Sequence, residues 1–225
     1  MGKCDQCIIK QFNSLKSLTK EELVRISSCK TTTTIKKGDV IFDEGDIVNG
    51  VYCVRHGICK LSKLSSNGKD QIVKIIVKGD LLGQRSIVSD EVSNLQATAL
   101  SDMEVCYIPK SEIVNNLQKN PKFSFDVLKE MAKDLREADN IIVNMAQKSV
   151  RQRLAETLIY IHKSFGTNPD GSLSVLLSRE DLANIVGTAI ESAIRVISQF
   201  KKEGLITTMG KRIKIDDLAG LGRVE

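Results

Sequence analysis

The stretch SREDLANIVGTAIESAIRVISQFKKEG, residues 178–204, decides the architecture of the C-terminal part of this chain. Ser178 is a good N-cap residue with Asp181 three positions later, so we expect a helix to begin here. Gly187 stands where that helix must end, at a turn that needs a residue tolerating a positive φ angle. The stretch therefore predicts a short helix followed by a tight turn.

A second helix is predicted over Ala189–Glu203, with an apolar residue at every third position: Ile194, Ile197 and Phe200. Two helices joined by such a glycine turn form a helix-turn-helix, whose second helix enters the major groove of DNA. Glu191 and Arg195 are four residues apart and share one face of that helix. Arginine can bind guanine through two hydrogen bonds, and glutamate can accept a hydrogen bond from cytosine. The alternative is a surface ion pair, worth only a few tenths of a kcal/mol.

The residues after the second helix alternate about a glycine turn, which predicts a small hairpin over residues 205–215. Four basic side chains lie on or just before this hairpin and can contact DNA phosphates. The alternative for each is a solvated surface residue. They are Lys201, Lys202, Lys211 and Arg212.

The first half of the chain follows a different pattern. A short helix is predicted over residues 14–28, with Ser17 or Thr19 as its cap. From residue 31 to about residue 108, short β-branched runs alternate with glycine turns roughly every ten residues. This spacing favours an antiparallel barrel or sandwich.

A long helix is predicted from residue 123 to 147, since this segment lacks proline and glycine. Its apolar residues are spaced by three and four positions over about three heptads: Leu128, Met131, Leu135, Ala138, Ile142 and Met145. Such a seam favours a partner helix, most simply its own copy across a two-fold axis. The alternative is that the helix packs only on its own domain.

The composition excludes several classes of protein. Hydrophobic residues make up 41% and charged residues 27%, which argues against disorder, and no apolar run approaches the ~20 residues of a membrane span. A net charge of +5 permits an acidic partner such as DNA without requiring one. The six cysteines all lie in the first half, and reduced thiols in a cytoplasmic protein are the simplest expectation.

The order of these motifs resembles that of the CRP/FNR family. Residues 178–187 with Glu191, Arg195 and the Gly210-Lys211 turn resemble its winged helix, and residues 35–57, 78–83 and 103–109 resemble its β-roll. The resemblance implies an α+β fold made of an antiparallel, cyclic-nucleotide-binding-like β-roll, a dimerisation helix and a winged helix-turn-helix. The implied domains are a sensory domain (residues 1–120), the dimerisation helix (121–147) and the DNA-binding domain (148–225).

The resemblance further implies a homodimeric transcription factor that binds palindromic double-stranded DNA and RNA polymerase, with no membrane partner. The residues expected to meet DNA are Ser178, Arg179, Thr188, Ala189, Glu191, Ser192, Arg195 and Lys211. An enzyme is disfavoured, because His56 and His162 are the only histidines and assemble with no recognisable catalytic set.

The cyclic-nucleotide branch of the family carries a Gly-Glu step and, about ten residues later, an Arg-Ser pair. Here the matching positions are Gly83-Gln84 and Ser93-Asn94. Because serine does not replace arginine at a phosphate site, the sequence argues against control by cyclic AMP.

The oxygen-sensing FNR branch holds an iron–sulfur cluster on cysteines, and Cys4, Cys7 and Cys106 resemble three of its ligands. Asn13 occupies the place of another cysteine, and Cys29 is a further candidate ligand. Alternatively, Cys4 and Cys7 form a redox pair or a weak zinc site, and Cys106 is packing, like Cys53 and Cys59. A regulator with structural cysteines, responding to another small effector or to no ligand, is the remaining hypothesis.

Overall fold

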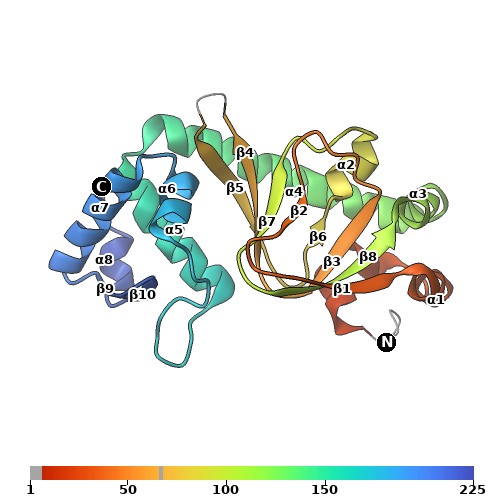
Figure 1. Ribbon diagram of the computed structural model, residues 1–225, viewed down its shortest axis with the longest axis horizontal. Coiled ribbons are helices and arrows are strands. Elements are labelled where there is room, and N and C mark those ends of the chain that lie inside the picture. The colour runs from red at the N-terminus through yellow and green to blue at the C-terminus, as the bar shows by residue number, and fades with distance from the viewer. Residues whose placement is uncertain (1–6, 66–67) are drawn as a thin grey trace. The chain divides into compact units, whose positions relative to one another are not determined.

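The computed structural model describes residues 7–65 and 68–225. The chain forms two compact units, one comprising residues up to 63 together with 73–137, the other comprising 64–72 and 138–225 (Figure 1). No helix in the described ranges is long and apolar enough to cross a membrane.

The first unit contains an antiparallel β-roll, as the turn spacing predicts. One four-stranded sheet has the order β1-β8-β3-β6 and the other the order β2-β7-β4-β5. Their strands are β1 (Thr31–Ile35), β2 (Val40–Phe42), β3 (Gly50–His56), β4 (Cys59–Leu64), β5 (Asp70–Ile76), β6 (Leu81–Leu82), β7 (Gln96–Ala99) and β8 (Met103–Pro109).

Helices surround the first sheet (Figure 1). They are α1 (Lys20–Cys29), α2 (Gln84–Ser89), α3 (Lys110–Lys119) and α4 (Pro121–Gln147), preceded by the 3₁₀ turns Ile8–Phe12 and Ser14–Ser17. The prediction of one helix over 14–28 was wrong at its start. Thr19 and Glu22 form a capping box that begins α1 at Lys20, and the Asn13 side chain caps the separate turn before it.

Two apolar cores stabilise this unit. The first fills the space between the β1-β8-β3-β6 sheet and its helices, and it includes Cys53, Cys106 and the buried face of α4 at Phe123 and Val127. The second includes Cys59 and residues of both sheets. The three buried thiols of the described residues, Cys53, Cys106 and Cys59, are therefore divided between two separate cores.

The second unit is the predicted winged helix-turn-helix. Its elements are α5 (Val150–Phe165), α6 (Arg179–Val186), α7 (Ile190–Lys202), the hairpin strands β9 (Ile206–Met209) and β10 (Arg212–Ile215), and α8 (Leu218–Leu221). The hairpin pairs Arg212 with Met209 across the Gly210-Lys211 turn. α7 begins one residue later than expected and ends one earlier, because Ala189 and Glu203 are its capping residues.

Candidate DNA-binding surface and thiol cavity

The angle between α6 and α7 is fixed by local hydrogen bonds. The Ser178 hydroxyl accepts a hydrogen bond from the backbone N–H of Asp181 at 2.9 Å, which starts α6. Gly187 ends it in the left-handed region, with φ 65° and ψ 54°, and the N–H of Thr188 donates to Ala183 O at 3.0 Å. The turn holds α7 in one direction without any metal or disulfide among the described residues.

α7 is amphipathic, but its buried face differs from the one expected. Ala193, Val196, Ile197 and Phe200 are buried, whereas Ile194 is 45% exposed. The prediction that Ile194 belongs to the apolar row was wrong, because the small Ala193 lies nearer the centre of the packed face. Ile194 instead lies beside Glu191 and Arg195 on the outer face. It is a candidate for apolar contact with a thymine methyl group, which sequence reasoning missed.

Glu191 and Arg195 are exposed on the outer face of α7. In the part of the chain that the structure describes, neither side chain takes part in an ion pair or a side-chain hydrogen bond. The surface ion pair offered above as the alternative is thus not formed. Both groups keep their full hydrogen-bonding capacity for an external partner, as does the exposed Lys211 at the tip of the wing.

The remaining expected DNA contacts are distributed around this helix. Thr188 and Ser192 are half-buried, and Ala189 is exposed at the N-terminus of α7. Arg179 donates from Nη2 to Gly210 O at 3.1 Å, which ties α6 to the wing. Burial of its guanidinium lowers its pKa. Arg179 therefore has a structural contact in addition to any contact with DNA.

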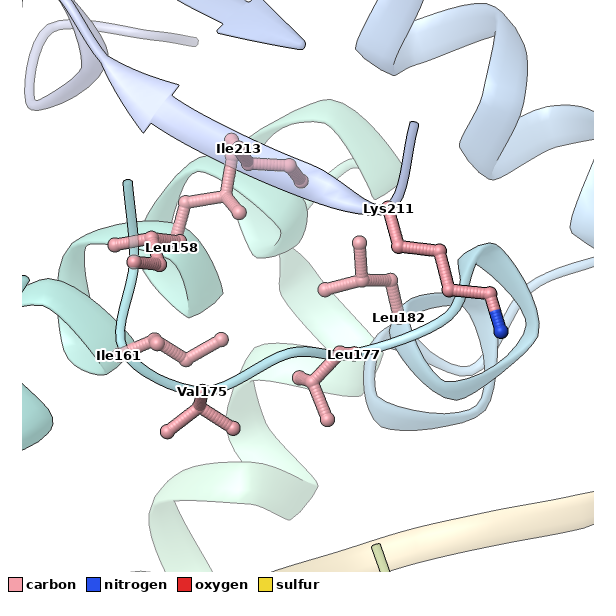
Figure 2. A pocket seen from close by; sticks show the side chains of 8 residues that line it. Leu158, Ile161, Val175, Leu177, Leu182, Lys211 and Ile213 are labelled. Atoms are coloured by element: carbon pink, nitrogen blue, oxygen red, sulfur yellow. The ribbon is translucent and has the colours of Figure 1, made fainter. Parts of the chain in front are cut away.

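A small apolar cavity of about 10 Å³ lies between the wing and the side chains on which it packs. Figure 2 shows the side chains of Leu158, Ile161, Val175 and Leu177 gathered beneath β10, with the Lys211 side chain extending away from them. A volume of ~10–15 Å³ holds at most about one water molecule. The cavity is therefore too small to be a ligand site. The apolar side chains around it pack the wing against α5.

The expected seam on α4 is only partly exposed. Leu128, Leu135 and Ile142 are 61%, 64% and 66% exposed and recur at intervals of seven residues. Met131 is half-buried because it packs against the core of its own unit. Met145 is also half-buried and Ala138 is exposed. α4 thus buries one face in the first unit and exposes a strip of large apolar side chains on another.

Three cysteines from separate segments line one cavity of about 20 Å³ in the first unit. They are Cys7, Cys53 on β3 and Cys106 on β8. The cavity also includes the buried Lys30, whose Nζ lies 3.9 Å from Cys106 Sγ. Cys4 lies outside the described residues. Cys29 does not line this cavity, and its thiol donates to Ile26 O instead.

Sequence reasoning assigned Cys53 to packing, and the structure buries it in the first core, directly opposite Cys106 on the neighbouring strand. Thiolates are ligands that iron and other soft metals prefer. In the present conformation, no three Cys, His, Asp or Glu side chains of the described residues are arranged to hold a metal ion.

The chain matches two known domain families. Residues 32–120 match the cyclic nucleotide-binding domain, and residues 152–224 match the Crp-like helix-turn-helix domain. It is 28% identical over 221 residues to an anaerobic regulatory protein of Haemophilus influenzae, covering 97% of this chain and 86% of that protein. The fumarate and nitrate reduction regulatory protein of Vibrio cholerae is 28% identical over 217 residues, with coverages of 94% and 86%. The chain belongs to the CRP/FNR family.

Solved structures of this family share the fold. FixK2 from Bradyrhizobium japonicum superposes with a TM-score of 0.79 at 23% identity, covering 87% of this chain and 97% of that one. A CRP/FNR regulator from Thermus thermophilus gives a TM-score of 0.68 at 23% identity, with coverages of 85% and 96%. These structures show the shared fold. The two domain matches and the regulator relatives make the chain a transcriptional regulator with a helix-turn-helix DNA-binding domain, and its relatives are regulators rather than enzymes. Membership of the family implies DNA binding and dimerisation.

Within the CRP/FNR β-roll, the positions that match the nucleotide-binding cassette have other partners here. Gln84 Nε2 donates to Glu130 Oε2 at 3.1 Å. The buried Ser93 hydroxyl donates to Leu95 O at 2.7 Å and stabilises the turn that leads into β7. Arg85 is exposed. The matching positions 84, 93 and 94 hold Gln, Ser and Asn, so none of them carries the positive charge expected at a cyclic-phosphate site.

Cys59 behaves differently from the cavity thiols. It is fully buried in the second core, and desolvation raises the pKa of its thiol to about 12. A thiol that stays protonated is a poor nucleophile and a poor metal ligand. The structure therefore supports the interpretation of Cys59 as a small apolar core residue.

Proposed function

We propose that this regulator reads palindromic DNA with α7, using Arg195 and Glu191 as base-contacting side chains. The observation that carries the proposal is that both side chains are exposed on one face of α7 and form no intramolecular ion pair. In a two-fold dimer, the two copies of α7 would meet half-sites about one helical turn apart, near 34 Å. Ile194 would add an apolar contact, and Lys211 at the wing would meet phosphate.

The proposal is tested by Arg195→Ala, with Lys163→Ala as a control. Both variants remove one exposed positive charge from the same unit, but Lys163 lies on α5, away from the helix-turn-helix. Loss of a base contact is worth ~1–3 kcal/mol, so preference for the cognate duplex over a random duplex should fall about 5- to 150-fold. Competition binding at fixed salt measures this preference. An unchanged ratio in Arg195→Ala would refute the role of Arg195.

We propose the division of the chain into a sensory domain (1–120), a dimerisation helix (121–147) and a DNA-binding domain (148–225). Its support is that α4 spans Pro121–Gln147 and carries the exposed strip of Leu128, Leu135 and Ile142. Such large exposed apolar residues on one helix favour association with a second copy. RNA polymerase is the further partner that family membership favours.

We propose that the signal is redox state or oxygen, sensed through Cys4, Cys7 and Cys106, rather than cyclic AMP. Support comes from the thiols in one cavity and from the partners already taken by Gln84 and Ser93. A bound iron–sulfur cluster would supply a group that oxygen destroys. The chain would contribute thiolate ligands and the nearby ammonium of Lys30, which offsets their negative charge.

Anaerobic purification with iron and sulfide analysis tests the metal part of this proposal. Iron bound with sulfide under those conditions supports the cluster. A protein free of iron whose DNA binding responds to a dithiol reductant favours a thiol pair instead. DNA binding that ignores oxygen, oxidants and reductants would overturn redox sensing and favour structural cysteines.

A further inference from the structure

We propose that Cys53 and Cys106 form a reversible disulfide when a peroxide oxidises the first unit, and that DNA binding responds to this bond. The inference rests on the proposed function, redox sensing, and names the pair of thiols that carries it in metal-free protein. It gives Cys53 a role beyond packing.

The strand register places the two thiols opposite each other. Cys53 of β3 pairs with Cys106 of β8 in the antiparallel ladder. Side chains of directly opposite residues project from the same face of a sheet. On that face both cysteines are buried in the first core, and both line the cavity of about 20 Å³. The two thiols therefore share one small space.

The backbone spacing of this pair suits a disulfide. The N–H of Val54 donates to Asp80 O, and Val54 O accepts from the N–H of Gly79, so both groups point away from β8. The main-chain groups of Cys53 therefore point toward β8, which makes Cys53–Cys106 a hydrogen-bonded pair. The Cα atoms of such pairs are about 5.5 Å apart. Disulfides join Cα atoms roughly 4.4–6.8 Å apart, so the bond requires only a small movement of the backbone.

Closing the bond draws β3 and β8 slightly together. The Cβ atoms of directly opposite residues are about 4.5–5.5 Å apart, whereas a disulfide brings them to about 3.8 Å. The bond therefore forms under some strain, and strain makes a disulfide easier to reduce. A bond that is readily reduced can act as a reversible switch.

Both sulfur atoms have hydrogen-bond donors beside them. Asn13 Nδ2 donates to Cys53 Sγ at 3.7 Å, and Lys30 Nζ donates to Cys106 Sγ at 3.9 Å. Such donors stabilise the negative charge that a sulfur atom carries when it attacks an oxidant. Cys59 lies in the second core instead, where desolvation raises the pKa of its thiol to about 12. The cavity pair is therefore favoured over Cys59 for oxidation.

Oxidation by hydrogen peroxide balances in two steps. One thiol attacks the peroxide, an S–O bond forms, the O–O bond breaks and water leaves, which gives a sulfenic acid. The second thiol attacks that sulfur, the S–S bond forms, the S–O bond breaks and a second water leaves. The pair loses two electrons and two protons, and the peroxide is reduced to two waters. Cys7 also lines the cavity and is only half-buried, so a small oxidant has a route in beside it.

The shared core connects this bond to α4. Phe123 and Val127 on the buried face of α4 belong to the same apolar cluster as Cys53 and Cys106. Close-packed interiors transmit small displacements, so a change in the spacing of β3 and β8 should shift the helix that carries the exposed apolar strip.

The test uses the full chain, freed of metal with a chelator, reduced, and then treated with hydrogen peroxide. Free thiols are alkylated under denaturing conditions, and mass spectrometry of the peptides identifies the linked cysteines. We expect a Cys53–Cys106 linkage in the wild type that disappears after treatment with dithiothreitol, while Cys29 and Cys59 are recovered alkylated. In the same samples, the dissociation constant for a duplex selected from a random pool should change about 5- to 150-fold, the usual range for coupled sites.

The variant Cys53→Ser, with Cys29→Ser as its matched control, links the bond to DNA binding. Both replace one thiol of the first unit by a hydroxyl, but Cys29 does not line the cavity. The DNA affinity of Cys53→Ser should ignore peroxide, whereas the control should respond like the wild type. Circular dichroism verifies folding, and Cys53→Ala replaces a serine variant that does not fold. Peptide mapping of the wild type needs no variant.

Each other outcome overturns a different statement. A disulfide from Cys7 to either cavity thiol, or no disulfide in a protein whose DNA binding still responds to oxidants, would overturn this pair and leave redox sensing intact. A Cys53–Cys106 bond that forms without changing DNA binding would overturn its role as a switch. DNA binding that ignores oxygen, oxidants and reductants, with no such bond formed, would overturn the proposed function itself.

Discussion

The apolar strip on α4 makes the association of two chains sensitive to one side chain. Leu135 is 64% exposed, so about two-thirds of its surface remains to be buried. Full burial of a leucine is worth ~1.5–3 kcal/mol, so completing it contributes about 1–2 kcal/mol per copy. Leu135→Ala removes this contribution from both chains of a two-fold dimer, about 2–4 kcal/mol in total. At 1.4 kcal/mol per tenfold, the dissociation constant should rise by about 30-fold to several hundred-fold.

Sedimentation equilibrium measures this dissociation constant, and Leu64→Ala is the matched control. Leu64 is 63% exposed but lies on β4 rather than α4. Because both leucines are mostly exposed in the single chain, neither substitution should alter its secondary structure. Leu135→Glu should give monomers. Equal dissociation constants for wild type and Leu135→Ala, or equal weakening by Leu64→Ala, would refute the assignment of this strip to the dimer interface.

Further predictions concern the two units separately. The pKa of Asp170 is lowered to about 2 by hydrogen bonds from Ser172 and Arg212. Its stabilising effect is therefore present above the unfolded-state pKa near 3.9 and lost as the pH falls toward 2. Asp170→Asn should flatten this acid limb in thermal melts of the protein, and an unchanged limb would contradict the assignment. Cys59 should resist iodoacetamide at pH 8 in the native state, since burial raises the pKa of its thiol to about 12, and rapid alkylation detected by mass spectrometry would contradict this. Ser178→Ala should lower stability by about 1 kcal/mol through loss of the α6 cap, measured by denaturant unfolding.

Local signals in the sequence predicted most elements of this fold. Cap residues, glycine turns and β-branched runs act within a few positions, which is why the start of the strand region at Thr31 and the turn at Gly187 were placed correctly. The long helix was also predicted, but the heptad pattern does not say which side faces its own domain. Met131 belongs to the expected seam by spacing, yet it packs inward. Only the positions of the surrounding sheets and helices decide that.

The thiol cavity shows the limit of sequence reasoning more sharply. Cys53 alternates with apolar residues along a strand, a pattern that predicts packing and is satisfied by its burial. Its position opposite Cys106 depends on the register between two strands far apart in the sequence. Ile194 is a similar case, because its exposure depends on how closely Ala193 approaches the rest of the unit. The proximity of Cys53 to Cys106 and the exposure of Ile194 are both relationships that only tertiary packing creates.

Thiol chemistry and dimerisation should be coupled, because they share one core. Cys53 and Cys106 belong to the same apolar cluster as Phe123 and Val127 on the buried face of α4, and Met131 packs against it. Close-packed interiors transmit small displacements, so a change in the cavity should shift α4. Iron loading is therefore expected to change the dimer dissociation constant. By linkage, dimerisation must change the affinity for iron by the same factor, so the two measurements check each other. A dimer dissociation constant that is identical with and without iron would show that the shared core does not couple iron binding to dimerisation.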